Sequence, residues 1–301
     1  MVELHVVQDA FRKGPHRMVE LGADGALAYW SFGQGPDVVF IHGWPLHGAT
    51  WRRLIPTLSE HFTCHVFDMP GIHHSRSWRG PIGMWEHTYT LQRAFEQLGL
   101  EQFAMVAHDS GGSIARMIAA EIPDRVSAIV LGNTEIPGVD LAGVDRMQRA
   151  IELPAVRPLM QMFMRSERVL RSKYGFASCF GDVSQLDTDF GEFFVKPLGH
   201  DRAYFDSQMT LVQNLNWNVV VEDLGPVHEK ITAPVMLIWG ERDPWFKWRL
   251  AKEMVDSFGS GPARVETFPT GKLFVHEEFA AQFAAWALEF LQDPPKTRLQ
   301  S

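Results

Sequence analysis

The residues best suited to chemistry lie where an apolar run meets a run of small residues. Phe103 to Ala107 is apolar, and His-Asp-Ser-Gly-Gly follows it directly. Small residues at positions 107 and 111 flank Asp109, which is the spacing of a tight turn between a strand and a helix. Backbone N–H groups at the start of such a helix favour negative charge. We therefore predict that Asp109 is a nucleophile held in its ionised form.

Two other interpretations of this turn remain open from the residues alone. Asp109 could simply cap the following helix, because Asp is common at that position. Ser110 could be the nucleophile instead, but His108 would then occupy a position that requires a small side chain.

The elements that must position this turn follow from the alternation of short apolar runs with longer amphipathic segments. This alternation is typical of a doubly wound, mostly parallel α/β sheet with helices on both faces. The expected strands are 37–41, 63–68, 103–107, 126–131, 234–239 and 263–268. The expected helices are 51–60, 86–98, 112–121 and 276–291.

A segment of different character interrupts this alternation between residues 135 and 228. It is rich in Met, Phe and Arg, and its helical periodicity is broken. We expect it to be a helical cap that divides the core into residues 1–134 and 229–301. Its Met and Phe side chains would suit an apolar pocket, or they form the interior of the cap.

Composition excludes several classes of function. The chain has 301 residues, of which 46% are hydrophobic and 21% charged, with a net charge of −8. No block of positive charge is present, which argues against a nucleic-acid partner. The two cysteines, Cys64 and Cys179, form no metal-binding or disulfide pattern.

We also expect no membrane-spanning segment and no secretory signal from the distribution of apolar residues. No run approaches the roughly 20 apolar residues of a membrane span, and the first residues lack the apolar stretch of a secretory signal. We expect a cytoplasmic protein that needs no metal and no organic cofactor, acts on an apolar small molecule and does not contact a membrane. The oligomeric state stays open, a homodimer included.

Four motifs in order resemble those of the epoxide hydrolase and haloalkane dehalogenase branch of the α/β-hydrolases. They are HGWP at 42–45, VAHDSGG at 106–112, LGNTEIPG at 131–138 and WGERDPWF at 239–246. The resemblance implies an α/β-hydrolase fold with an inserted cap. It covers about residues 25–135 and 230–290.

The resemblance also implies roles for particular residues. Asp109 attacks a substrate carbon to form an ester, while the backbone N–H groups of Trp44 and Ser110 form an oxyanion-type hole. Asp243 orients the histidine that activates water. Five further residues are expected to line the substrate pocket: His42, His108, Asn133, Trp217 and Asn218.

The chain departs from the family at the histidine. Lys272 stands where the histidine is expected, and His276 precedes the Glu pair that usually follows it. An ammonium group has no lone pair to accept a proton, so we expect Lys272 to pair with Asp109 or Asp243. His276, one helical turn further on, is the candidate base, and His73 or His74 in the loop after the 63–68 strand are alternatives.

Two classes of function follow from this pattern. The first is an epoxide-hydrolase-like reaction on an apolar substrate, with a dehalogenase as a variant of it. The second is a non-hydrolytic cyclase, isomerase or lyase in which Asp109 acts as a base. Lys272 and Asn218 favour the second class, because Asn218 replaces a tyrosine that protonates the substrate oxygen in epoxide hydrolases. The motif set as a whole favours the first.

Overall fold

A single eight-stranded sheet organises the chain, in the order β1-β2-β4-β3-β5-β6-β7-β8. The computed structural model describes residues 2–139, 142–259 and 264–295. The strands are β1 (Arg17–Glu20), β2 (Ala26–Phe32), β3 (Asp37–Ile41), β4 (Thr63–Phe67), β5 (Phe103–Ala107), β6 (Val126–Gly132), β7 (Val235–Gly240) and β8 (Arg264–Phe268). Strands β3 to β8 are parallel, and β1 and β2 pair antiparallel at one edge. The predicted α/β-hydrolase fold is confirmed.

The expected strands agree closely with the observed ones. Strands β3 and β5 have the predicted bounds, and β4, β6 and β7 differ by one residue at one or both ends. Residue 263, where the last strand was expected to begin, lies outside the described residues. The antiparallel pair β1 and β2 was not predicted, because its short, unequal apolar runs lack the alternation with helices that marks the rest of the sheet.

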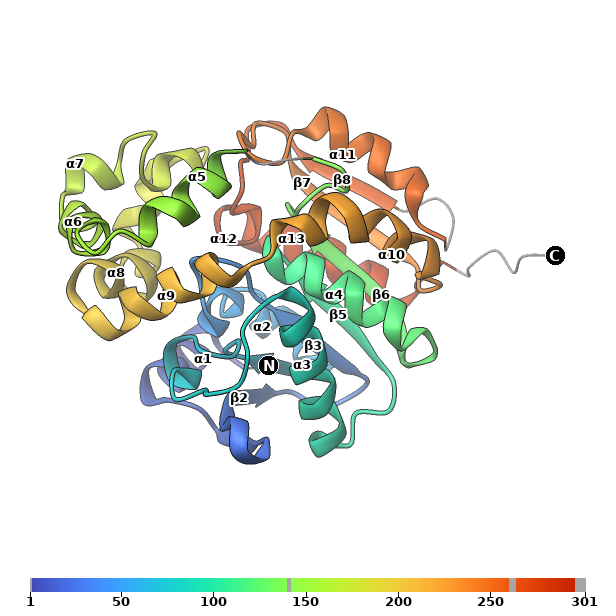
Figure 1. The fold of residues 1–301 in the computed structure, drawn as a ribbon. Helices are drawn as coiled ribbons and strands as arrows, with labels where there is room; N and C mark the ends of the chain where they lie inside the picture. Colours follow the sequence, from blue (N-terminus) through green and yellow to red (C-terminus); the bar gives the residue numbers. More distant parts are fainter. Residues whose placement is uncertain (1, 140–141, 260–263, 296–301) are drawn as a thin grey trace.

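Two groups of helices cover opposite faces of this sheet (Figure 1). Helices α3 (Met84–Leu98), α4 (Ser110–Glu121) and α10 (Leu224–Lys230) pack side by side, as do α1 (Leu4–Lys13), α2 (Ile55–Leu58) and α13 (Ala280–Gln292). The expected helix 51–60 is reduced to a 3₁₀ turn and α2, because Pro56 is tolerated only in a first helical turn. The expected helix 276–291 is split at Phe279 into α12 (Val275–Glu278) and α13. Helix α11 (Trp248–Met254) precedes β8.

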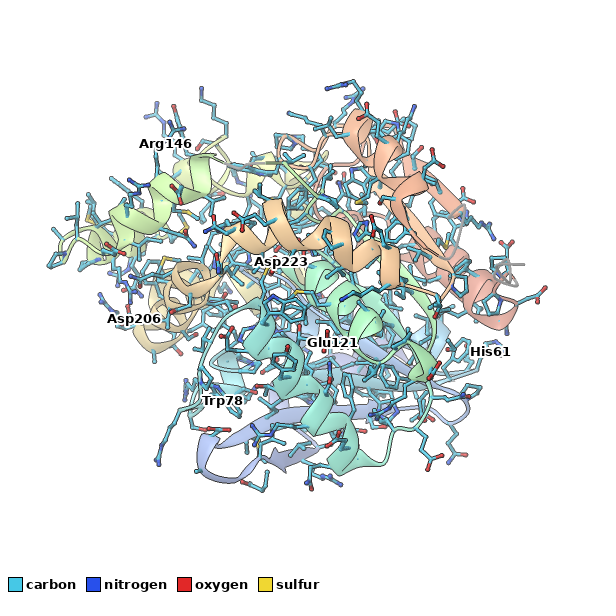
Figure 2. The ribbon with its side chains drawn as sticks, turned by 45° about the vertical axis from the view of Figure 1, so that its right-hand side comes forward. His61, Trp78, Glu121, Arg146, Asp206 and Asp223 are labelled. Carbon is cyan, nitrogen blue, oxygen red and sulfur yellow. The ribbon has the colours of Figure 1, made fainter. Side chains whose placement is uncertain are left out.

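Helices make up the regular structure between β6 and β7 in the described part of the chain. They are α5 (Ala142–Ile151), α6 (Val156–Phe163), α7 (Glu167–Leu170), α8 (Lys196–His200) and α9 (Arg202–Asn214), with π-helical turns at Gly191–Val195 and Val219–Asp223. Figure 1 shows α5, α6, α8 and α9 grouped to one side of the sheet. Helix α10 already packs against α4, so the core resumes before residue 229. Charged side chains such as Arg146 of α5 point outward from this group (Figure 2).

No helix among the described residues is both long enough and apolar enough to cross a membrane.

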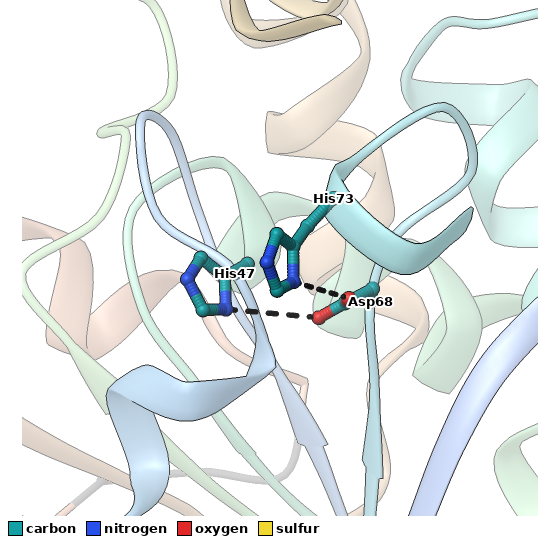
Figure 3. Close-up of side chains that lie close together, drawn as sticks. All are labelled: His47, Asp68 and His73. Carbon is teal, nitrogen blue, oxygen red and sulfur yellow. Dashed lines mark hydrogen bonds and ion pairs between the residues drawn. The ribbon is translucent and has the colours of Figure 1, made fainter. Parts of the chain in front are cut away.

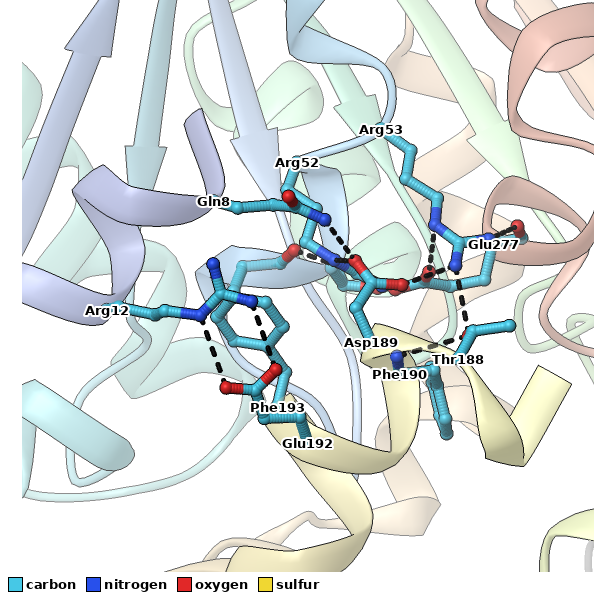
Figure 4. Close-up of polar contacts among 12 residues, drawn as sticks. Gln8, Arg12, Arg52, Arg53, Thr188, Asp189, Phe190, Glu192, Phe193 and Glu277 are labelled. Atoms are coloured by element: carbon cyan, nitrogen blue, oxygen red, sulfur yellow. Dashed lines mark hydrogen bonds and ion pairs between the residues drawn. The ribbon is translucent and has the colours of Figure 1, made fainter. Parts of the chain in front are cut away.

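A buried ion network joins this helical segment to the core (Figure 4). Arg52, which follows the loop after β3, is fully buried and pairs with Asp189 of the cap and with Glu277 of α12, the latter at 2.7 Å. Arg53 also pairs with Asp189. Removing one member of a buried network leaves its partners desolvated without a counter-charge, so the network constrains how cap and core meet.

We expect Arg52→Ala to destabilise the protein by about 3–5 kcal/mol, because Glu277 would stay buried with its main counter-charge lost. Urea unfolding followed by circular dichroism measures the change. Arg149→Ala is the matched control, because the Arg149–Asp145 pair is exposed and should contribute almost nothing. Equal unfolding midpoints for the two variants would contradict this account.

Candidate active site

Asp109 lies in a strained turn between β5 and α4. Its φ of 53° and ψ of −138° are unusual for a residue with a side chain. Close packing around this turn requires glycine at two positions. A Cβ on Gly43 would lie 2.4 Å from the Asp109 Cβ, and one on Gly111 would lie 2.4 Å from the Ile41 carbonyl oxygen. A conformation of this kind costs about 1–3 kcal/mol and persists only where the surroundings impose it. The turn therefore holds the Asp109 side chain in one position.

The two carboxylate oxygens of Asp109 have different surroundings. Oδ1 accepts hydrogen bonds from the backbone N–H of Trp44, at 3.0 Å, and of Ser110, at 2.7 Å. Oδ2 accepts none from the described residues, and Asp109 lines the main cavity. One oxygen is thus anchored by the two predicted backbone donors, and the other is free to meet a ligand.

A buried glutamate lies behind this carboxylate. Glu135 accepts a hydrogen bond from the hydroxyl group of Ser113 at 2.7 Å, and its backbone carbonyl accepts one from the guanidinium group of Arg116 at 2.9 Å. Burial, together with the negative charge of Glu135, raises the pKa of Asp109 to about 8, against the effect of the two N–H donors. Asp109 is therefore mainly neutral at pH 7, so the prediction that the helix N-terminus holds it ionised is wrong: the effect of burial outweighs that of the N–H donors.

The second predicted acid, Asp243, is buried in the loop after β7. Its Oδ2 accepts from the side-chain amide of Asn133 at 2.7 Å, and its Oδ1 accepts from the backbone N–H of Trp245 at 2.7 Å. Burial raises the pKa of Asp243 to about 6. None of its hydrogen bonds within the described chain involves a histidine, so Asp243 orients no imidazole here.

The prediction for Lys272 is wrong. Its ammonium group donates to the backbone carbonyl of Ala177 at 2.7 Å and forms no ion pair with Asp109 or Asp243 in the described structure. Two neighbouring carboxyl groups with raised pKa values attract a cation less strongly than two fixed charges would, and a cap carbonyl is within reach. Lys272 therefore links the core to the cap rather than neutralising the acids.

His276 lies in the core instead of the cavity. Its Nε2 is 2.7 Å from the hydroxyl oxygen of Thr50, whose proton goes to Glu277, so Nε2 carries a hydrogen and donates it. Burial lowers the pKa of His276 well below its usual range. Because the imidazole does not line the cavity, the structure does not support its role as the base.

The other candidate histidines also lie outside the cavity. His42 accepts from the backbone N–H of Met69 at 2.9 Å, and His108 donates to the carbonyl of Leu273 at 2.9 Å, both fully buried. The prediction that they line the pocket is wrong. Both rings hydrogen-bond to the backbone of neighbouring loops instead, at Met69 and at Leu273. His73 and His74 lie beside Asp68 and do not line the cavity either.

The cavity above Asp109 has a volume of about 360 Å³, within the roughly 300–1,000 Å³ usual for small-ligand sites. Its wall is largely apolar, and within the described part of the chain no histidine contributes to it. Most lining residues come from the cap: Val144, Met147, Met160, Met164, Lys173, Tyr174, Gly175, Phe176, Ser178, Cys179, Leu198, Phe205, Met209, Val212, Leu215 and Trp217. The core adds Trp44, Pro45, Asp109, Trp245, Phe246, Leu273 and Phe274.

Among the remaining predicted pocket residues, only Trp217 lines the cavity. Asn133 binds Asp243 instead, and Asn218 is not in the wall, so both of those pocket predictions are wrong. Cys179 was not singled out from the sequence, and no local motif marks it. Burial raises the pKa of its thiol to about 12, so it presents a neutral group to the ligand.

The Met-rich stretch of the cap is divided between pocket and surface. Met160 and Met164, four residues apart on one helical face, line the cavity. Met162 and Phe163 face solvent. Once the position of α6 is known, the four-residue spacing separates the side chains that line the cavity from those that face solvent.

We expect Glu135→Gln to lower the pKa of Asp109, because it removes a nearby negative charge while keeping a hydrogen-bond acceptor for Ser113. A ¹³C NMR titration of protein labelled at aspartate carboxyl groups measures it, with Asp109→Asn to assign the signal. Glu241→Gln, at an exposed glutamate, serves as the control. An unchanged titration of Asp109 in Glu135→Gln would show that Glu135 does not act on it.

Comparison with known proteins agrees with this geometry. The sequence profile of the alpha/beta hydrolase fold family matches residues 36–280. Haloalkane dehalogenase 2 of Mycobacterium tuberculosis is 30% identical over 270 residues, which cover 88% of this chain and 91% of that protein. A pimeloyl-(acyl-carrier protein) methyl ester esterase of Vibrio campbellii is 35% identical over 107 residues, and this chain covers only 39% of its length.

Solved structures are similar over nearly the whole chain. The epoxide hydrolase CorEH has a TM-score of 0.74 at 18% identity, covering 92% of this chain and 98% of that one. The putative ancestral haloalkane dehalogenase AncHLD2 has a TM-score of 0.72 at 19% identity, with coverage of 92% and 98%. At such low identity these likenesses show the fold alone, while the profile match places the chain in its family. The chain belongs to the alpha/beta hydrolase fold family.

Proposed function

We propose that the protein is an enzyme in which the Asp109 carboxylate attacks a carbon atom of an apolar small molecule, such as an epoxide or an alkyl halide. One observation carries the proposal: Oδ1 is anchored by two backbone N–H groups while Oδ2 is unpartnered at the wall of an apolar cavity. An anchored carboxylate presents its free oxygen in a fixed direction, which lowers the entropic cost of attack.

The same anchors would serve the second half of the reaction. A bond forms between Oδ2 and the substrate carbon as the carbon–oxygen or carbon–halogen bond breaks, which leaves an ester on Asp109. The ester carbonyl oxygen is then Oδ1, between the N–H groups of Trp44 and Ser110. When water adds to this carbonyl, the developing negative charge falls between two donors that are already in place.

A donor for the leaving group is available in the cap. Trp217 lines the cavity, and its indole N–H has no acceptor within the described structure. An unpaired buried donor costs about 1–3 kcal/mol, which a bound oxygen or halide would recover. The indole of Trp44 is not free for this role, because it donates to the Gln208 carbonyl at 3.0 Å. We therefore propose that the indole N–H of Trp217 donates a hydrogen bond to the leaving group.

Proton transfer by Asp109 is the second candidate function, and a specific observation favours it. No histidine of the described residues lines the cavity, so no imidazole is in place there to activate water against the ester. A carboxyl group with a pKa of about 8 is well matched to giving and taking protons near neutral pH. An isomerisation, cyclisation or elimination would use that property without any ester.

The named relatives support the first candidate without deciding it, since they include a haloalkane dehalogenase and an ester esterase. Of the structural neighbours, one is an epoxide hydrolase. We further propose that the protein acts in the cytoplasm, as its sequence suggests.

Intact-protein mass spectrometry after incubation with a panel of aryl epoxides and alkyl halides tests the first candidate. We expect one equivalent of adduct, or released diol or alcohol, from the parent and neither from Asp109→Asn, because the amide is isosteric but a poor nucleophile. Asp145→Asn, at an exposed aspartate of α5, should behave as the parent does. Adduct formation by freshly purified Asp109→Asn, shown free of deamidation, would rule out Asp109. No adduct and no product from the parent would favour proton transfer.

The pH dependence of adduct formation separates the candidates further. Attack needs the charged carboxylate, and with a pKa of about 8 the charged fraction rises roughly 50-fold between pH 6 and pH 8, then about twofold more. We expect the initial rate at low substrate concentration to follow this rise. If Asp109 instead acts as an acid, turnover of the true substrate should fall as the pH passes 8; if it acts as a base, turnover should rise over the same range with no adduct formed.

A further inference from the structure

Three imidazoles gather around one buried carboxylate away from the cavity. His47 follows β3, Asp68 follows β4, and His73 and His74 begin the 3₁₀ turn His73–Ser75. Figure 3 shows the rings of His47 and His73 side by side, both directed at the Asp68 carboxylate. One nitrogen of each of these two rings and one oxygen of Asp68 lie within 4.8 Å of one another. Three segments distant in the sequence thus bring metal-ligating groups together.

The separations are close to those of a metal site. His73 Nδ1 is hydrogen-bonded to Asp68 Oδ2 at 3.1 Å, and His47 Nδ1 is 3.9 Å from Asp68 Oδ1. Two ligands about 2.0–2.2 Å from a tetrahedral ion are about 3.3–3.6 Å apart, and an ion bound here would take the place of the proton between His73 and Asp68. Small movements of the two imidazole rings would bring their nitrogens to that spacing from the Asp68 oxygens.

The hydrogen bonds of His47 fix its tautomer. Its Nε2 is 3.1 Å from the carbonyl oxygen of Phe193, which can only accept, so Nε2 carries the hydrogen. Its Nδ1 accepts a long bond, 3.4 Å, from the backbone N–H of Ala49. The lone pair of Nδ1 therefore faces Asp68 Oδ1 with no proton between them. Asp68 Oδ1 already accepts a hydrogen bond from the backbone N–H of Gly48 at 2.8 Å, and a cation between Oδ1 and Nδ1 would bind the lone pairs that these backbone donors leave free.

His74 lies at the edge of this cluster. Its Nδ1 is 3.4 Å from Asp68 Oδ2 and is shielded from solvent, but His74 is not among the three residues whose ligand atoms lie within 4.8 Å of one another. The side chains of His73 and His74 are 26% and 31% exposed, which leaves an ion a route from solvent.

We propose that His47, Asp68 and His73 bind a divalent transition-metal ion of the zinc class. Imidazole nitrogens select Zn²⁺, Co²⁺ or Ni²⁺ over Mg²⁺ and Ca²⁺, which prefer oxygen ligands. The N–H of His47 that donates to Phe193 is the outer-shell contact that usually orients a ligating histidine. This site is separate from Asp109, and the proposal is independent of the proposed function.

A bound ion would strengthen the connection between parts of the molecule that hydrogen bonds already join. The loop that carries His47 also carries Trp44, a donor to Asp109, and Pro45, part of the cavity wall. The Phe193 carbonyl belongs to a π-helical turn of the cap. The ion would therefore connect the nucleophile's anchor, the core strand β4 and the cap.

Metal binding to the full-length protein tests the proposal. The chain is treated with EDTA, dialysed and titrated with ZnCl₂ by calorimetry, and Co²⁺ is used to record visible absorption bands. We expect one equivalent of Zn²⁺ and a raised unfolding temperature, because a ligand that binds only the folded state stabilises it. His73→Asn is the chosen variant, because Asn tolerates the positive φ of 44° at this position.

The expected loss of affinity in His73→Asn is at least about 10-fold, since even outer-shell changes cost about 10–100-fold. His61→Asn is the matched control, at an exposed histidine on the surface of the core (Figure 2), and should bind as the parent does. Asp68→Asn provides a second, isosteric variant with the same expected loss. No tight Zn²⁺ binding by the parent would overturn the proposal and indicate a bridging water instead. Equal binding by the parent, His73→Asn and Asp68→Asn, or an equal loss in His61→Asn, would also overturn it.

Discussion

The contact between Asp109 Oδ1 and two backbone N–H groups is the constraint on which the site depends. Ser110 contributes its N–H from the first turn of α4, and Trp44 contributes its N–H from the loop after β3. Two loops from neighbouring parallel strands can meet on one oxygen only if nothing occupies the space between them. Gly43 and Gly111 leave that space free, and the positive φ of Asp109 directs the carboxylate into it.

Burial decides the electrostatics of this site more than pairing does. The pKa of Asp109 is raised to about 8 and that of Asp243 to about 6, in each case chiefly because the group is removed from water. Asp243 is the less perturbed of the two, since Asn133 and two backbone N–H groups donate to it. With Lys272 bound to a cap carbonyl, neither acid forms an ion pair with a cation among the described residues, and the charge of Lys247 only partly offsets the effect of burial on the pKa of Asp243. Of these two acids only Asp109 lines the cavity, whereas Asp243 holds the loop after β7 through the backbone N–H groups of Trp245 and Phe246.

A single stretch of chain after β3 connects the features of the molecule. It supplies the Trp44 donor, a wall of the cavity at Pro45, the His47 imidazole and the Arg52 guanidinium that holds cap to core. His47 and Arg52 both contact the cap near residues 189–194. A change in the position of the cap would therefore move the loop that anchors the Asp109 carboxylate.

The sequence by itself determined the parallel strands and the tight turn at Asp109, whereas the two backbone donors to Asp109 were implied by the resemblance to a known family. The strands and the turn are encoded locally, because apolar runs of strand length and obligatory small residues leave few alternatives at β3, β5 and Asp109. The tertiary structure alone decided which groups the histidines, Lys272 and Asn133 bind. A polar side chain in a core hydrogen-bonds to whichever partner the packing brings near, and those partners, Thr50 for His276 and Ala177 for Lys272, are far away in sequence. The cavity wall and the cluster around Asp68 arise in the same way, from segments that meet only once the chain has folded.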